Sequence, residues 1–312
     1  MPDRRPPART RRQPRRTDAG PAAYAGAHAI STGSAELTVD RDDPAGWFVV
    51  VNGVPSSYVH LDDPTRLEFE YVRWIGDLLD VLDRDAALPA PLRVAHLGGG
   101  GCTLARYVAA TRPGSRQVVF EIDGDLVELV RRAFGIRRDQ GFRIRVADAR
   151  DGLRTLPDAS HDVVIRDVFA GNQVPPALTT VEFCADLARV MAPDGTYVAN
   201  VADRTEQRHA RAEAATLREV FRHVALVAEP SQLRGRRYGN VLLLASKAPL
   251  PLDPLTRRLA SGAVRARVVR PERLAELVAG LRPLTDPTPW PAHDDPCQFP
   301  TKHGECTAQR GE

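Results

Sequence analysis

Between residues 93 and 246, short apolar runs alternate with segments whose apolar positions recur at helical spacing. The runs cover residues 93–97, 117–122, 143–148, 161–167, 196–202, 223–229 and 240–246, and the main segments cover 102–111, 124–134, 181–191 and 206–221. Strands separated by helices of about 10 to 15 residues indicate βαβ units, and continuous apolar strands indicate burial on both faces. The pattern therefore predicts an α/β fold with a doubly wound, mostly parallel seven-stranded sheet.

Upstream of this region the pattern changes to short extended runs at residues 35–40, 47–53 and 56–61, separated by Asp, Asn, Gly and Pro. Such turn residues between short strands predict a small antiparallel β unit. From Leu67 to Leu82 apolar residues return at helical spacing, which predicts an amphipathic helix that packs against the sheet.

Four divisions of the chain follow from these patterns. Residues 1–33 are rich in Arg and Pro and are expected to form a disordered tail, and residues 34–64 form the N-terminal β-hairpin unit. Residues 65–248 form the main α/β domain. Residues 249–312 form a Pro- and Arg-rich C-terminal extension with one helix at 272–281 and a disordered end.

The composition, 43% hydrophobic and 27% charged over 312 residues, is ordinary for a water-soluble protein. No apolar run reaches the about 18–20 residues that cross a bilayer, and no apolar segment follows the N-terminal arginines as in a signal peptide. We therefore expect a cytoplasmic protein without a membrane partner. The net charge of +3 comes from residues 1–18, which contain seven arginines and two aspartates. We interpret this tail as a solvated extension and do not expect it to bind nucleic acid.

The four cysteines, Cys102, Cys184, Cys297 and Cys306, form no C-x-x-C pair. Neither a zinc site nor a disulfide framework is indicated, and the sequence predicts no metal site.

Four glycines, Gly98–Gly101, lie between the first strand of the sheet and the helix that follows it. A glycine turn at a helix N-terminus lets a ligand lie against backbone N–H groups, although glycines also serve close packing of a strand and a helix. Glu121 ends the second strand 23 residues after Gly98, where an acid can accept both hydroxyls of a ribose. A dinucleotide site would place a third glycine at Thr103, so the pattern favours an adenosyl ligand without a pyrophosphate.

Two aspartates end the next two strands. Asp148 can accept a hydrogen bond from an adenine amino group, or cap the following helix. Asp167 follows the fourth strand, at the switch point where α/β sheets bind ligands, and can act as a base towards an amine or simply cap the next loop. Asn200 and Asp203, at the end of the fifth strand, are candidates for the acceptor side or for strand termination.

These motifs resemble the spermidine synthase branch of the S-adenosylmethionine-dependent methyltransferase fold, which is Rossmann-like. The resemblance spans residues 35–246 and rests on "LEFEYVRW", "LGGGGCT", "EID", "ADAR", "DVFAGNQVPP" and "APDGTYVAN". It implies that the domain of residues 65–248 is catalytic and acts in polyamine biosynthesis.

The resemblance also implies roles for single residues. Gly98, Gly99 and Gly100 would form the donor loop, Glu121 would bind the ribose, and Asp148 with Ala149 would bind the adenine. Asp167 would be the catalytic residue. Tyr71 would hold the amine substrate, His60 stands where the family commonly has a glutamine, and residues 168–180 would form a loop over the site.

This sequence departs from the family pattern at several of these positions. Gly101 and Ala170 stand where the family has aspartates that contact cationic groups, and Val72 and Arg73 replace a histidine and a glutamate. Charge-assisted hydrogen bonds are about twice as strong as neutral ones, so the losses argue against putrescine as the acceptor.

The sequence therefore predicts a transferase that binds an adenosyl sulfonium donor as a co-substrate, with no tightly bound cofactor. Its specific form would be transfer of an aminopropyl group from decarboxylated S-adenosylmethionine to a polyamine or related small-molecule amine. The alternatives are a methyltransferase that uses intact S-adenosylmethionine and a non-catalytic relative. The resemblance further implies a homodimer joined through the N-terminal β unit.

Overall fold

A sheet of eight strands forms the centre of the protein. The computed structural model describes residues 20–82, 89–137, 140–171, 173–204, 206–262 and 264–287. The strand order across the sheet is β12-β10-β11-β9-β8-β5-β6-β7. The strands are β5 (Arg93–Leu97), β6 (Arg116–Glu121), β7 (Phe142–Val146), β8 (His161–Arg166), β9 (Met191–Asp203), β10 (His223–Ala228), β11 (Gly239–Ser246) and β12 (Arg267–Val269).

The sheet is parallel from β7 to β9 and antiparallel beyond β9, where β11, β10 and β12 follow. The predicted mostly parallel α/β sheet is confirmed, and its seven apolar runs correspond to β5–β11. The predicted number of strands is wrong by one, because β12 adds an eighth at the edge. This strand has only three residues and begins with an arginine, so it carries too little periodicity to be recognised.

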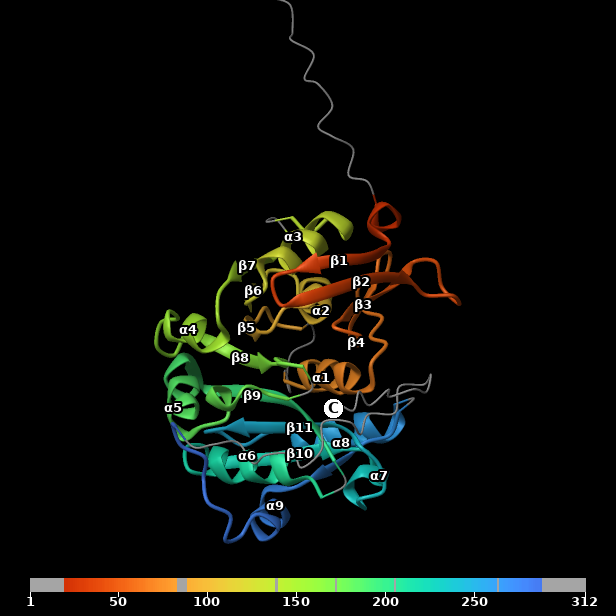
Figure 1. Cartoon of the computed structure of the whole chain (residues 1–312). Coiled ribbons are helices and arrows are strands. Elements are labelled where there is room, and N and C mark those ends of the chain that lie inside the picture. The colour runs from red at the N-terminus through yellow and green to blue at the C-terminus, as the bar shows by residue number, and fades with distance from the viewer. Residues whose placement is uncertain are drawn as a thin grey trace, which may run out of the picture.

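Helices cover both faces of the sheet, as Figure 1 shows. On one face lie α1 (Glu70–Asp80), α2 (Thr103–Thr111) and α8 (Leu252–Ser261), whose apolar residues join one core cluster. On the other lie α4 (Ala149–Arg154), α5 (Val181–Val190), α6 (Arg208–Arg218) and α9 (Pro271–Leu277). A 3₁₀ turn, η2 (Pro176–Leu178), precedes α5, and a short helix, α7 (Pro230–Leu233), precedes β11.

The helix α8 lies in the C-terminal extension and was not predicted. Leu252, Leu255 and Leu259 are buried against the core that also contains α1. Pro254 lies in the first turn of α8, where the missing N–H has no intrahelical partner to lose. The proline therefore does not prevent the helix.

A second sheet, β1-β2-β3-β4, is antiparallel and lies at the N-terminal end of the described chain. Its strands are β1 (Gly26–Ile30), β2 (Gly33–Val39), β3 (Gly46–Val51) and β4 (Val54–His60), after a 3₁₀ turn, η1 (Pro21–Tyr24). The helix α3 (Gly124–Ala133) of the large domain packs against this sheet and shares its core.

The disordered tail predicted for residues 1–33 is wrong for residues 26–30, which form β1 paired with β2. Only Ile30 of β1 is buried, and the strand otherwise consists of Gly, Ala and His. This composition resembles a small-residue linker, and the strand exists because the edge of β2 pairs with it. Residues 1–19 and 288–312, with Cys297 and Cys306, lie outside the described residues.

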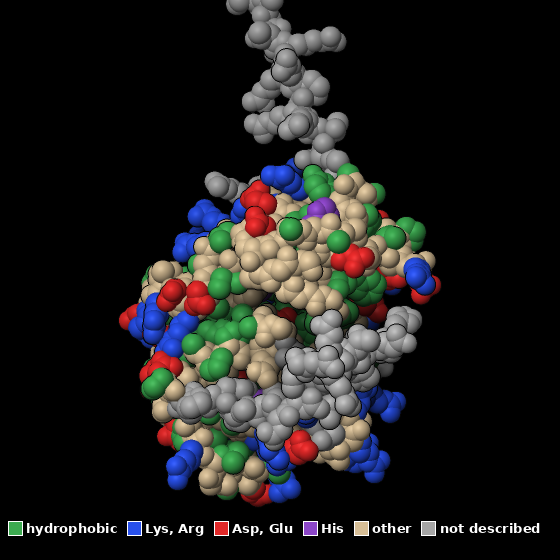
Figure 2. All heavy atoms as spheres, in the orientation of Figure 1, with side chains coloured by type: hydrophobic (Ala, Val, Ile, Leu, Met, Phe, Trp, Pro, Cys, Tyr) green, Lys and Arg blue, Asp and Glu red, His purple; other side chains and the backbone are tan. Residues whose placement is uncertain are grey.

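No helix in the described part of the chain is long and apolar enough to cross a membrane. On the face drawn in Figure 2, Lys and Arg side chains are interspersed with Asp and Glu side chains, mainly around the edge. Charges of both signs are therefore mixed over this face.

Candidate active site

The candidate residues come together at the carboxyl edge of the parallel strands. Gly98 follows β5, Glu121 ends β6, Asp148 lies just beyond β7, and Asp167 follows β8. Adjacent parallel strands end at the same edge, so residues far apart in the sequence meet there.

Gly98 touches the backbone that carries Asp167. Its φ is +92°, and a Cβ atom at this position would overlap the carbonyl oxygen of Asp167. The Asp167 N–H donates to the carbonyl of Leu97 at 2.9 Å, and the Gly98 N–H donates to the carbonyl of Phe120 at 2.9 Å. The first glycine is therefore required both by its left-handed conformation and by the close approach of β5 and β8.

Glu121 lies under the glycine turn. Its Oε2 accepts hydrogen bonds from the N–H groups of Gly99 at 2.8 Å and Gly100 at 3.1 Å, and its Oε1 accepts from the Asp123 N–H at 3.1 Å. A carboxylate has about four lone-pair positions, so Glu121 can still accept a hydroxyl hydrogen bond. The same carboxylate thus fixes the turn, and its role in binding a ribose stays a prediction.

Gly101 is closed in by the small sheet. Its N–H donates to Ser57 Oγ of β4 at 2.9 Å. A Cβ atom at Gly101 would lie 2.7 Å from Val59 Cγ2 and 3.0 Å from Ser57 Cβ. The space that an aspartate side chain would need is therefore occupied by β4. Nothing in the sequence pattern singled out Ser57.

Asp148 is the N-cap of α4, since its Oδ1 accepts from the N–H groups of Arg150 at 2.8 Å and Asp151 at 3.1 Å. The capping alternative is therefore observed, and it leaves Oδ2 available for a ligand. Ala149 is the first residue of α4 and is buried. The adenine-binding role of both residues stays a prediction.

Asp167 is held by two neutral donors from different elements. The Tyr71 hydroxyl of α1 donates to Asp167 Oδ2 at 3.0 Å, and Asn200 Nδ2 of β9 donates to Asp167 Oδ1 at 2.9 Å. Burial raises the pKa of Asp167, opposed by the hydrogen bonds from Asn200 and Tyr71 and by the charge of Arg166. Burial, with the charge of Asp167, also raises the pKa of Tyr71, which keeps its hydroxyl protonated as a donor. The pairing of Tyr71 with Asp167 brings two predicted site residues together.

The other oxygen-bearing groups near Asp167 differ in what they can offer a ligand. Asn200 is 1% exposed, and its Oδ1 accepts no hydrogen bond from the described residues. It can therefore accept one from an amine. Asp203 is also buried, but its carboxylate accepts from the N–H groups of Arg204 and Ala210 and so fixes the start of α6. Asp203 therefore has a structural role at the start of α6.

Arg166 lies on the opposite side of β8 from Asp167, since successive strand residues point to opposite faces. It forms a fully buried ion pair with Glu213 of α6 at 2.6 Å and donates to the Tyr197 hydroxyl at 2.8 Å. This pair fixes the strand end behind Asp167.

His60 is separate from the pair formed by Tyr71 and Asp167. Its ring nitrogens are 3.1 Å from Asp43 Oδ2 and 2.9 Å from the Asp63 N–H, both in or beside the small sheet. Its assignment as a substrate residue stays a prediction. Among the described residues, no group of three His, Cys, Asp or Glu side chains could hold a metal ion.

Comparisons with known proteins identify relatives by sequence and by fold. No protein-family model matches the chain. The crystal structure of a probable spermidine synthase from Corynebacterium glutamicum has a TM-score of 0.77 and 39% sequence identity, covering 88% of this chain and 99% of that one. A polyamine aminopropyltransferase of Chromobacterium violaceum is 31% identical over 146 residues, 46% of this chain, and the match spans about half (53%) of that protein.

A methyltransferase is also among the relatives. The mouse eEF1A lysine and N-terminal methyltransferase is 26% identical over 126 residues, which are 38% of this chain and 18% of that protein. This similarity is confined to a smaller share of both chains.

We predict that Gly98→Ala destabilises the protein more than Gly135→Ala. Both glycines have positive φ, but no atom lies within 4 Å of a Cβ at Gly135. Gly135→Ala should cost about 1–2 kcal/mol, the strain of a left-handed residue, and Gly98→Ala should cost about 1–3 kcal/mol more because of steric overlap. Denaturant unfolding measures both, and equal losses would contradict the close approach to Asp167.

A second prediction concerns Asp167→Asn and pH. The raised pKa of Asp167 means that the folded state binds its proton more tightly than the unfolded state, so this group stabilises the fold at low pH and loses that contribution as pH rises. The loss begins near the unfolded pKa of about 3.9 and is complete above the folded pKa. The free energy of unfolding of Asp167→Asn, relative to the unchanged protein, should therefore increase with pH in that window. A difference that decreases with pH would contradict the raised pKa.

Proposed function

Because the chain belongs to the spermidine synthase-like family of transferases, we propose that it transfers an aminopropyl group from decarboxylated S-adenosylmethionine to an amine. The observation that carries the proposal is the carboxylate of Asp167, held by Tyr71 and Asn200 beside the glycine turn. The acceptor nitrogen attacks the methylene carbon beside the sulfonium. A C–N bond forms, the C–S bond breaks, and methylthioadenosine leaves as a neutral thioether.

The donor would lie along the carboxyl edge of the sheet. Gly98, Gly99 and Gly100 form a turn that allows close approach, and Glu121 would accept the ribose hydroxyls. Asp148 and Ala149, at the start of α4, would contact the adenine. The donor is a co-substrate that leaves after each turnover.

Asp167 would accept the proton of the attacking amine. Alkyl amines are protonated at neutral pH, so the nucleophile must lose a proton before or during attack. A raised pKa makes Asp167 a stronger base than an exposed aspartate, which suits a general base. Tyr71 and Asn200 fix the direction of its carboxylate, and the free Oδ1 of Asn200 would accept a hydrogen bond from the same amine.

The acceptor would carry less positive charge than a diamine bound between carboxylates. Gly101 and Ala170 supply no acid, and Asp203 is occupied by the start of α6. Of the four positions Gly101, Ala170, Asp167 and Asp203, Asp167 is the one that would present a carboxylate to the amine.

Methyl transfer from intact S-adenosylmethionine is the alternative. It is favoured by the closed space at Gly101, because a donor tail that carries its own carboxylate needs no aspartate to balance its ammonium. The similarity of part of this chain to a methyltransferase supports this alternative.

We predict that Asp167→Asn lowers the rate of methylthioadenosine formation by about 10²–10⁴-fold, the usual contribution of a general base, with little change in donor binding. The assay contains decarboxylated S-adenosylmethionine and 1-aminobutane, an amine of lower charge than a diamine, and chromatography quantifies methylthioadenosine. The matched control is Asp158→Asn, a 77%-exposed aspartate paired with Arg189, which should retain full activity. Unchanged turnover in Asp167→Asn would remove Asp167 from the mechanism, and an unchanged protein that turns over only intact S-adenosylmethionine would favour the alternative.

A further inference from the structure

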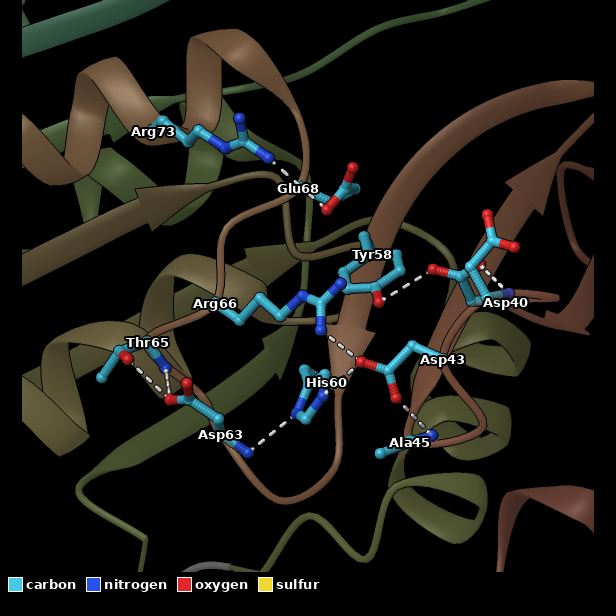
Figure 3. A network of polar contacts seen from close by, with 11 residues as sticks. Asp40, Asp43, Ala45, Tyr58, His60, Asp63, Thr65, Arg66, Glu68 and Arg73 are labelled. Carbon is cyan, nitrogen blue, oxygen red and sulfur yellow. Dashed lines mark hydrogen bonds and ion pairs between the residues drawn. The ribbon is translucent and has the colours of Figure 1, made fainter. Parts of the chain in front are cut away.

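The connection between β4 and α1 is fixed by a network of polar contacts outside the candidate site. Figure 3 shows this network, which joins the turn between β2 and β3 to residues 60–66. The segment 61–69 follows β4 and leads directly to Glu70, the first residue of α1, and to Tyr71. Whatever fixes this segment therefore fixes the position from which Tyr71 reaches Asp167.

His60 is the centre of the network. Its Nδ1 accepts a hydrogen bond from the Asp63 N–H at 2.9 Å, so a neutral ring carries its proton on Nε2 and donates it to Asp43 Oδ2 at 3.1 Å. The residue is 9% exposed. Both ring nitrogens are used, so His60 has none left for a substrate.

Asp43 connects His60 to two further groups. Its carboxylate accepts hydrogen bonds from the Ala45 N–H at 3.0 Å and from the Arg66 guanidinium. The hydrogen bond from Ala45 contributes most to lowering the pKa of Asp43, and His60 and Arg66 lower it further. Asp43 therefore stays ionised and holds both ends of residues 60–66.

Two links run from this network to Tyr71. Arg73 of α1 donates to the carbonyl of Leu67 and pairs with Glu68 at 3.5 Å, which joins the first turn of the helix to the segment before it. A row of rings connects the small sheet to the same tyrosine. Their centroids are 5.0 Å apart for Tyr58 and Phe48, 6.4 Å for Phe48 and Phe69, and 6.2 Å for Phe69 and Tyr71.

We propose that His60 is a positioning residue, which clamps residues 61–66 onto the small sheet and thereby holds the Tyr71 hydroxyl on Asp167. Residues 61–69 transmit its position to α1. This role takes the place of the direct substrate contact that the resemblance implies. It deepens the proposed function and rests on it for the task of Asp167, but its test does not require turnover.

The test is a double-mutant cycle read out on Asp167 itself. Carboxyl-carbon NMR, assigned with Asp167→Asn, measures the pH at which Asp167 titrates in the full chain. Tyr71 and Asn200 contact this carboxylate through hydrogen bonds, and Arg166 acts on it through its charge from the opposite side of β8. Since the Tyr71 hydrogen bond lowers the pKa of Asp167, Tyr71→Phe should move the titration up by about one pH unit, the scale of a hydrogen bond to a charged group. His60→Ala should move it in the same direction, and the double variant no further than Tyr71→Phe.

Conservative variants separate the two bonds of His60. His60→Asn keeps an acceptor near the Asp63 N–H, and His60→Gln keeps a donor near Asp43, so each should restore part of the shift. The matched control is His28→Ala, which removes the hydrogen bond between a β1 histidine and the Tyr24 carbonyl at 2.8 Å and should leave the titration unchanged. If His60→Ala does not fold, the Asn and Gln variants carry the test.

Two results would overturn the proposal. One is a titration of Asp167 that stays unchanged in the His60 variants while Tyr71→Phe moves it. The other is a shift that adds fully to that of Tyr71→Phe, because His60 would then act without Tyr71. Absence of methylthioadenosine formation by the unchanged protein would count against the proposed function alone, since the NMR titration is independent of activity.

Discussion

In the part of the chain that the structure describes, the site depends on placing one carboxylate, Asp167, among protein atoms without a direct cation partner. Burial favours its neutral form, and two neutral donors favour the charged form at hydrogen-bond distance. A partly buried carboxylate without a paired cation is costly, so its neighbours must be held accurately. Gly98 closes one side, β9 supplies Asn200, and α1 supplies Tyr71. The small sheet acts on this group indirectly, because it fixes the segment that leads into α1.

Most of the strands β5–β11 could be predicted because they are continuous apolar runs between helical segments, and β7 could be predicted although its apolar residues alternate with arginines. Elements without such a signal were missed. β1 is made of small residues, β12 has three residues, and α8 contains a proline whose position in the first turn makes it harmless. In each case the element is stabilised by pairing or packing with a neighbour that the local sequence does not reveal.

The site could be predicted in part. The positions of Gly98, Glu121, Asp148 and Asp167 follow from strand ends, which share one edge of a parallel sheet. The contact between Tyr71 and Asp167 spans 96 residues of sequence and was not predicted, since the family resemblance suggested only that each residue belongs to the site. Ser57 gave no signal, since its role arises from the docking of β4 on the glycine turn. His60 was placed with the substrate, whereas its observed partners lie in the small sheet.

The departures from the family pattern have a structural counterpart. Gly101 faces Ser57 and Val59 at distances that leave no room for an aspartate, so the missing carboxylate is accommodated by the packing of the small sheet. In the proposed function, the donor tail would meet a hydroxyl and a methyl group at this point, and recognition of its ammonium would depend on other groups. Binding of the donor therefore distinguishes aminopropyl transfer from methyl transfer.

Calorimetric titration with decarboxylated and intact S-adenosylmethionine under matched conditions tests the central claim most directly. Aminopropyl transfer predicts that the decarboxylated donor binds at least about tenfold more tightly, a difference of about 1.4 kcal/mol. Tighter binding of intact S-adenosylmethionine would contradict the claim and identify the pocket as one suited to methyl transfer.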